Sequence, residues 1–190
     1  HTRAFLKIQD GCNSFCTFCV IPFARGKSRS LSIADITRRV TELHAGGMQE
    51  VVLTGVHIGD YRDGEKGLED LIEGVLKGSG IPRLRLTSLE PPEVTSRLLE
   101  LYVEPRLCPH FHMSIQSANT KVLFDMKRQY KAEAIETALM AIDGQVPGSF
   151  VGMDVIAGFP GESDEEFIDS TERLRRLPWT RLPVFPSSSR

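Results

Sequence analysis

Three of the four cysteines lie within eight residues of one another, as Cys12, Cys16 and Cys19, while Cys108 stands alone. Two disulfides would require a strained link inside this triplet, so in a reducing cytosol the spacing favours a metal site. A structural zinc ion normally has four protein ligands. Three thiolates instead leave one iron of a four-iron cubane without a protein ligand, and a small molecule can bind there. The triplet therefore predicts an iron–sulfur cluster with one open coordination position.

Two other interpretations of the cysteines stay open. Cys108 or a histidine could complete a zinc knuckle with the triplet, or the cysteines could be inert core residues. The second interpretation is disfavoured because residues typical of an exposed loop surround the triplet: Asp10, Gly11, Asn13 and Ser14. Three histidines are interpreted as structural residues at strand ends: His57, His110 and His112. Cys108 itself is interpreted as a buried free thiol.

Short apolar stretches and helical stretches alternate along the chain, and they must position the cysteine loop, residues 11–20. Six strands are predicted, at residues 4–9, 50–56, 83–88, 111–116, 150–157 and 182–185. Five helices are predicted between them: one of about fourteen residues that Ser32 caps, and others near residues 67–77, 94–103, 131–142 and 163–177. Strict alternation implies parallel strands with right-handed crossovers, in an open sheet or a barrel. We expect a single α/β domain over residues 1–190.

Composition excludes several classes of protein. The 190 residues are 41% hydrophobic and 25% charged, as in a soluble globular domain. A net charge of −2 excludes a whole-surface electrostatic grip on nucleic acid, although residues 1–48 carry seven basic and three acidic residues, a local +4. No apolar run approaches the roughly 20 residues of a membrane helix. We therefore expect a cytoplasmic protein with no membrane association.

The motif Cys-x3-Cys-x2-Cys, with Phe18 before its last cysteine and a strand before the motif, resembles the signature of the radical S-adenosylmethionine (SAM) superfamily. More closely, five segments are similar to the methylthiotransferase family, in particular its tRNA-modifying branch: GCNSFCTFCVIPFARGKSRS, LTGVHIGDY, SLEPPEV, SIQSANTKVLFDMKRQY and DVIAGFPGE. This resemblance runs from about Arg3 to Pro186. It implies a partial (β/α)6 barrel with parallel strands and outer helices.

The resemblance also implies a reaction. Cys12, Cys16 and Cys19 would hold a 4Fe-4S cluster, SAM would bind its open iron, and an electron from the cluster would cleave SAM to methionine and a 5′-deoxyadenosyl radical. The implied activity is 2-methylthiolation of N6-threonylcarbamoyladenosine next to the tRNA anticodon. The alternatives are isopentenyladenosine in tRNA, a ribosomal-protein aspartate, and a non-catalytic metal-stabilised RNA-binding module.

By the same resemblance, nine residues at strand ends would contact SAM: Thr54, Gly55, Ser88, Glu90, Gln116, Ser117, Asp154, Ile156 and Gly158. Gly55 would let the backbone approach the amino group of SAM. Ser88 and Glu90 would reach its carboxylate or ribose, and Ile156 would pack on its adenine. The family usually has Gln-Ser-Gly at this point, whereas this chain has Gln-Ser-Ala with Ala118. The difference affects the loop geometry that the resemblance implies. No catalytic residue is expected beyond the cluster ligands.

Complete members of the family have three parts: a preceding domain with three more cysteines, a central domain, and a small C-terminal β-domain that helps to bind RNA. We expect residues 1–190 to be the central domain alone, and to be monomeric. The implied partners are tRNA and a reductant such as flavodoxin or ferredoxin. Five basic residues form a candidate patch for RNA phosphate: Arg25, Lys27, Arg29, Lys127 and Arg128.

Overall fold

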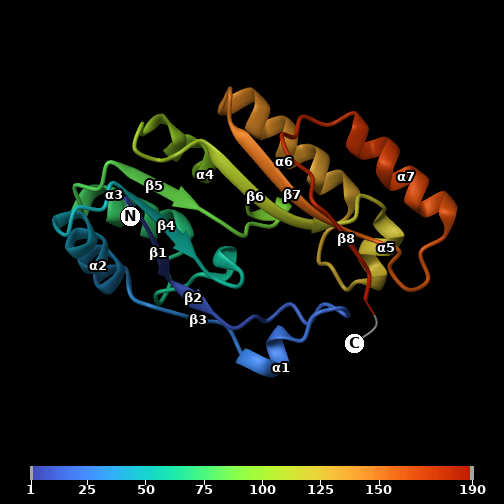
Figure 1. Cartoon of the computed structure of the whole chain (residues 1–190), viewed down its shortest axis with the longest axis horizontal. Helices are drawn as coiled ribbons and strands as arrows, with labels where there is room; N and C mark the ends of the chain where they lie inside the picture. Colours follow the sequence, from blue (N-terminus) through green and yellow to red (C-terminus); the bar gives the residue numbers. More distant parts are fainter. Residues whose placement is uncertain (1, 189–190) are drawn as a thin grey trace.

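The computed structural model describes residues 2–188, in which six parallel strands form a curved layer with helices on its outer side (Figure 1). β4 (Glu50–Thr54) pairs with both β1 (Arg3–Lys7) and β5 (Arg83–Leu86). β7 (Phe150–Ala157) likewise pairs with both β6 (His110–Gln116) and β8 (Val184–Pro186). Single bridges, Leu84 with Leu107 and Leu89 with Met113, join the two groups. Within residues 2–188 no pairing joins β1 to β8, so the predicted partial barrel is confirmed as an open one.

Five helices cross from one strand to the next, as the alternation predicts. They are α2 (Ile33–Ala45), α3 (Leu68–Gly78), α4 (Ser96–Glu100), α6 (Ala132–Gln145) and α7 (Asp164–Arg175). Ser32 caps α2 by accepting a hydrogen bond from the Asp35 backbone N–H, as expected. The helix predicted at 94–103 is α4 followed by a 3-10 turn, Leu101–Val103. None of the helices in the described part of the chain is long and apolar enough to cross a membrane.

Several short elements were not predicted. β2 (Gln9–Asp10) pairs antiparallel with β3 (Arg29–Ser30), and α1 (Ile21–Arg25) lies between them. α5 (Thr120–Asp125) follows β6, and 3-10 turns span Ile58–Asp60 and Pro91–Glu93. The third barrel strand ends at Leu86 and not at the predicted Ser88, because Ser88 has φ +54° and leaves the extended conformation. All of these pieces lie next to the carboxyl ends of the strands, where the cysteine loop is.

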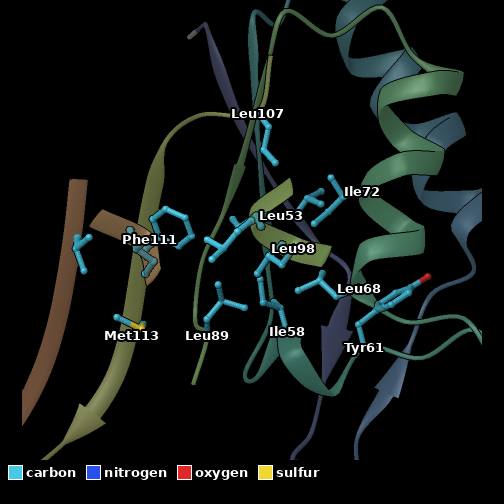
Figure 2. Close-up of a cluster of buried hydrophobic side chains, with 14 of the residues drawn as sticks. Leu53, Ile58, Tyr61, Leu68, Ile72, Leu89, Leu98, Leu107, Phe111 and Met113 are labelled. Atoms are coloured by element: carbon cyan, nitrogen blue, oxygen red, sulfur yellow. The ribbon is translucent and has the colours of Figure 1, made fainter. Parts of the chain in front are cut away.

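The two faces of the strand layer differ in chemistry because side chains alternate along each strand. On β6 the buried residues Phe111, Met113 and Ile115 face the helices. They join one continuous apolar core, in which Leu53 and Leu89 from the sheet meet residues from the helices and connecting segments (Figure 2). The inner face carries mostly polar and charged side chains, with apolar exceptions such as Phe5 and Ile156.

Charged residues hold that inner face together. The Glu50 carboxylate receives Nε groups of Arg85 at 2.7 Å, Arg3 at 3.0 Å and Arg83 at 3.2 Å. Further round the layer, His112 Nε2 lies 3.3 Å from Asp154 Oδ2. Burial of the outer face thus fixes the curvature, while the inner face and the strand ends stay available to polar ligands.

Candidate functional site

The cysteine loop is anchored at its start and in its middle. Cys12 donates its backbone N–H to Gly26 O at 3.1 Å, which ties the loop start to the β2–β3 pair. Thr17 donates its backbone N–H to Met126 O at 3.2 Å and its hydroxyl to Asp125 O at 3.1 Å. Phe18 packs in a small apolar cluster, separate from the main core, with Val122, Met126, Ile156 and Phe159. The last residue of α5 and the residue after it therefore hold the loop over the ends of β6 and β7.

The three thiols of the loop differ in their surroundings. Cys12 and Cys16 are buried and Cys19 is half-buried, and all are free thiols. The His57 imidazole beside Cys12 lowers the pKa of that thiol. Burial raises the pKa of Cys16, although the Arg128 charge opposes the change. The thiolate is the form that binds a metal. Of these two cysteines, Cys12 therefore loses its thiol proton more readily and is the better prepared to bind one.

The spacing of the thiols bears on which metal they fit. In residues 2–188 the sulfurs of Cys12, Cys16 and Cys19 do not all lie within 4.8 Å of one another. A single tetrahedral zinc ion with Zn–S bonds of about 2.3 Å requires sulfurs about 3.8 Å apart. A cubane suits a wider set, because each thiolate binds a different iron. Cys108 lies just before β6, at the opposite end from the loop, and is a buried free thiol, as expected.

A cavity of about 690 Å³ opens beside Cys19. Three of the predicted SAM contacts line it, namely Gln116, Asp154 and Ile156. Phe18 and Phe159 add aromatic walls, and the cavity continues to the residues that follow β8. Its volume and mixture of apolar walls with a few polar groups are typical of a small-molecule site.

The other six predicted SAM contacts are not among the residues that line this cavity. Ser117 is buried, and its hydroxyl accepts from Asn119 N at 3.1 Å and lies 3.4 Å from Ser170 Oγ. Thr54 ends β4 and is half-buried. A Cβ on Gly55 would lie 2.7 Å from Gln9 Oε1, so close packing inside the protein already requires glycine there. Ser117 and Gly55 thus both make close contacts inside the protein, and their contact with SAM stays a prediction.

Gly158 follows β7 in a left-handed conformation, φ +70°, which glycine adopts without strain. Its N–H donates to Glu162 Oε2 at 2.8 Å, and Phe159 N–H donates to the same oxygen at 3.2 Å. Glu162 therefore fixes the turn of the GFPGE segment, and this turn places Phe159 at the cavity wall.

Strained backbone is concentrated at the site. Among the described residues only four other than glycine have positive φ: Phe15, Ser88, Gln116 and Lys127. Phe15 is in the cysteine loop, Ser88 lies just past β5, and Gln116 is the last residue of β6, where the pairing with β7 shifts register. Such conformations persist where the surrounding structure holds them, and they cluster at functional sites.

Arg128 is the main correction to the expected phosphate patch. Its side chain is only 6% exposed, and Nη1 donates to the Glu90 carboxylate. Nη2 donates to Ser114 O, and the guanidinium lies 5.8 Å from the ring centroids of both Phe18 and Tyr130. Arg128 is therefore an internal link between the segment that follows β5, strand β6 and the cysteine loop. Glu90, expected to reach SAM, is bound to it.

The remaining basic residues are exposed, but two of them are paired. Arg29 lies 2.9 Å and Arg25 3.4 Å from the Asp10 carboxylate. Lys27 and Lys127 are exposed. Asp10 thus neutralises part of the charge of the expected phosphate patch, and Arg128 is not part of that patch because it is buried.

His57 is a site residue that the sequence analysis missed. It is buried beside Cys12, its backbone N–H donates to Gln9 Oε1 at 3.0 Å, and its Nε2 contacts the Glu93 carboxylate. Burial alone lowers the pKa of His57, but its interactions with Cys12 and Glu93 raise it to about 10. The one available signal was that His57 follows β4 at the same edge as the cysteine loop.

Comparison with known proteins agrees with this geometry. Residues 6–174 match the family model of the radical SAM superfamily. The chain is 42% identical, over 190 residues, to "Threonylcarbamoyladenosine tRNA methylthiotransferase MtaB" of Treponema pallidum (strain Nichols), covering 100% of this chain and 39% of that protein. It is 44% identical to the protein of the same name from Aquifex aeolicus (strain VF5), covering 99% and 46%.

A third relative bears another substrate in its name. The chain is 36% identical to "tRNA-2-methylthio-N(6)-dimethylallyladenosine synthase" of Syntrophomonas wolfei subsp. wolfei (strain DSM 2245B / Goettingen), covering 98% of this chain and 43% of that protein. The chain thus spans less than half the length of these curated relatives.

Solved structures share the fold at low sequence identity. The radical S-adenosylmethionine methyltransferase TsrM from Kitasatospora setae superimposes with a TM-score of 0.79 at 15% identity, over 96% of this chain and 36% of that one. Coproporphyrinogen III oxidase (HemN) from Escherichia coli gives 0.69 at 16% identity, over 98% and 44%.

Proposed function

Because the chain belongs to the radical SAM superfamily, we propose that it is the central domain of a tRNA methylthiotransferase, which holds a 4Fe-4S cluster and cleaves SAM reductively. One observation carries the proposal. Cys19 shares a cavity with Gln116, Asp154 and Ile156, so a ligand in that cavity lies directly beside the cysteine loop. Cys12 and Cys16 complete a set of three free thiols, which would leave one iron of a cubane without a protein ligand.

The chain's own residues prepare the site for this chemistry. The bound cluster supplies the electron that cleaves the sulfonium of SAM. Phe18 and Thr17 hold the cysteine loop against the end of α5, which fixes the position of Cys19 at the cavity. Ile156 and Phe159 provide an apolar wall that suits the adenine ring and excludes water. Gln116 and Asp154 offer polar groups to the ribose and amino acid portions.

The proposed target is N6-threonylcarbamoyladenosine next to the tRNA anticodon. Identity supports it: relatives named for that nucleoside match at 42% and 44%, against 36% for one named for dimethylallyladenosine. In the whole protein, this domain would work with parts that bind tRNA and supply sulfur. It would act in the cytoplasm as a monomer and take electrons from a carrier such as flavodoxin or ferredoxin.

The test starts with the 190-residue chain. Anaerobic reconstitution with iron and sulfide, followed by dithionite and SAM, should yield 5′-deoxyadenosine. The Cys19→Ser variant should lose both the cluster and the product. Its matched control, Cys108→Ser, changes a cysteine outside the triplet and should keep both. A sample with a full four-iron cluster that forms no 5′-deoxyadenosine would overturn the proposal.

The substrate is tested with the whole protein. Transfer RNA that carries threonylcarbamoyladenosine should gain a methylthio group, whereas tRNA that carries isopentenyladenosine should not. Modification of isopentenyladenosine alone, or of a ribosomal-protein aspartate alone, would move the protein to another branch of the family. Binding of RNA and zinc with no turnover would leave only the metal-stabilised module.

A further inference from the structure

Three side chains that could hold a metal converge beside the cysteine loop, and only one belongs to the cysteine triplet. One ligand atom from each of Cys12, His57 and Asp60 lies within 4.8 Å of the others, and no other such group is found in residues 2–188. Cys12 comes from the loop itself. Asp60 is the last residue of the 3-10 turn after β4, and His57 is the residue just before that turn. Cys12 and His57 are buried, and the Asp60 side chain is 31% exposed.

Two polar atoms of this group are unsatisfied. His57 Nδ1 and Asp60 Oδ2 are both buried without a hydrogen-bond partner, and His57 as a residue is only 9% exposed. The two atoms face each other at 3.8 Å, which is too far for a hydrogen bond. Buried polar atoms are rarely left without a partner, and an ion between these two would satisfy both.

The other nitrogen of His57 is already committed. Nε2 contacts Glu93 Oε1, and the second carboxylate oxygen of Glu93 accepts from Glu90 N–H at 2.7 Å. A Cβ on Gly59 would come within 1.8 Å of the Glu93 carboxyl carbon, so the glycine makes room for this carboxylate. Metal-binding histidines commonly donate one ring N–H to a carboxylate while the other nitrogen binds the metal. Glu93 therefore orients Nδ1 toward Asp60 and Cys12.

We propose that Cys12, His57 and Asp60 form a binding site for a single Zn²⁺ ion in the cluster-free protein. A thiolate, an imidazole and a carboxylate are all ordinary zinc ligands, at about 2.0 to 2.3 Å. Bonds of about 2.0 Å place nitrogen and oxygen ligands about 3.3 Å apart, so the 3.8 Å gap between Nδ1 and Oδ2 closes with a small movement. Water completes the tetrahedron through the exposed side of Asp60.

Binding has two chemical consequences. The ion takes the place of the protons on His57 Nδ1 and on the Cys12 thiol, so zinc uptake releases protons to solvent. Cys12 cannot serve both sites, so zinc and the iron–sulfur cluster exclude each other. Zinc bound here would block cluster assembly until it is removed.

The experiment uses the cluster-free 190-residue chain and Zn²⁺ in competition with a chromophoric chelator. The double variant C16S/C19S, which cannot hold the cluster, should still bind one Zn²⁺ with an affinity within about three-fold of the unaltered chain. Cys12→Ser and His57→Ala should each weaken binding at least about 100-fold. Glu93→Gln, which keeps the three ligands, should weaken it about 10- to 100-fold. Asp60→Asn supplies a second ligand variant if His57→Ala does not fold, as judged by circular dichroism.

Cobalt gives an independent readout of the ligands. Co²⁺ in place of Zn²⁺ should show tetrahedral visible bands with a thiolate charge-transfer band in C16S/C19S, and should lose them in Cys12→Ser. If C16S/C19S abolishes zinc binding while His57→Ala retains it, the triplet holds the ion and the inference is wrong. Absence of zinc binding in the unaltered chain also overturns it. Neither result affects the formation of 5′-deoxyadenosine by the cluster-loaded chain. The zinc proposal and the proposed SAM cleavage can therefore fail independently of each other.

Discussion

At the scale of single residues, the buried guanidinium of Arg128 connects more of the site than any cysteine does. It ties Glu90 to the carbonyl of Ser114 and lies against Phe18 of the cysteine loop. An arginine suits this position because its planar, weakly hydrated charge can stack on rings and donate several hydrogen bonds at once. Glu90 supplies the opposite charge that makes burial tolerable.

Removing this charge should destabilise the fold strongly. Arg128→Gln removes the hydrogen-bonded charge partner of the buried Glu90 carboxylate and leaves it only the His57 ring at 4.0 Å, so the free energy of unfolding in urea should fall by about 3–5 kcal/mol. Lys127→Gln, at the exposed neighbouring position, should change it by less than about 0.5 kcal/mol. The double variant R128Q/E90Q should recover part of the loss. Equal stabilities for the two single variants would show that the buried pair is unimportant.

Glu50 should make stability depend on pH at the acidic end. Burial by itself raises the pKa of this carboxyl, but Arg85 and Arg3 more than offset it, so the net pKa lies below its usual 4.5. A carboxyl with a lowered pKa in the folded state contributes stability above its unfolded pKa, and loses it as pH falls through the folded value.

The matching experiment compares Glu50→Gln with the unaltered chain by denaturant unfolding. The difference in unfolding free energy should be about 2 kcal/mol at pH 7 and should shrink as pH falls below 4.5. Glu42→Gln, which breaks an ion pair on the exposed face of α2, should change little at either pH. A difference that grows on acidification would contradict the assignment.

At the scale of elements, the β2–β3 pair decides how the cysteine loop begins. Gly11 has φ +76°, and a Cβ there would lie 2.2 Å from Lys27 O and 2.7 Å from Gly26 O. The backbone of the returning segment therefore packs against the start of the loop where only glycine fits. Gly26 has nearly the same φ, +77°, but a Cβ on it would meet no atom within 4 Å.

These two glycines make a matched pair. Gly26→Ala should cost about 1–3 kcal/mol of unfolding free energy, from backbone strain alone, because φ +77° with ψ −164° is a conformation that almost only glycine adopts. Gly11→Ala adds a backbone clash, so it should cost several-fold more or displace the loop, with faster hydrogen exchange over residues 11–20. If both variants lose the same stability and exchange alike, close packing at Gly11 is not what holds the loop.

At the scale of the whole molecule, one core joins the two groups of strands. Few backbone pairings connect β5 to β6, yet the apolar core is continuous across them (Figure 2). Phe111 is fully buried in that core, with its ring centroid 4.6 Å from that of Tyr102. A shared core of this kind makes the two halves unfold together.

Phe111→Ala should therefore lower the stability of the entire chain. The expected loss is about 3–5 kcal/mol, with one cooperative transition that coincides by fluorescence and circular dichroism. Phe5→Ala is the control, because that ring is 71% exposed on the inner face. Two separate transitions in the Phe111 variant would mean that the halves of the sheet are independent.

The sequence by itself determined the order of the strands and crossover helices along the chain and the spacing of the three cysteines in the loop. The short apolar stretches that became β4, β6 and β7 are a local property, and so are the cap of α2 and the spacing of Cys12, Cys16 and Cys19. Each depends on residues close in the chain, which is why these predictions could be made. The short elements around the loop carried no periodicity long enough to detect.

Only the tertiary structure decided which polar groups meet. Arg128 pairs with Glu90 across 38 positions and His57 with Glu93 across 36. Cys12 of the cysteine loop lies beside His57, which follows β4. Charge in the sequence could not separate a buried Arg128 from an exposed Lys127, because the environment of each side chain depends on how β5, β6 and the loop pack. Burial and long-range contact set charge pairing and pKa, and both arise only when separate elements come together.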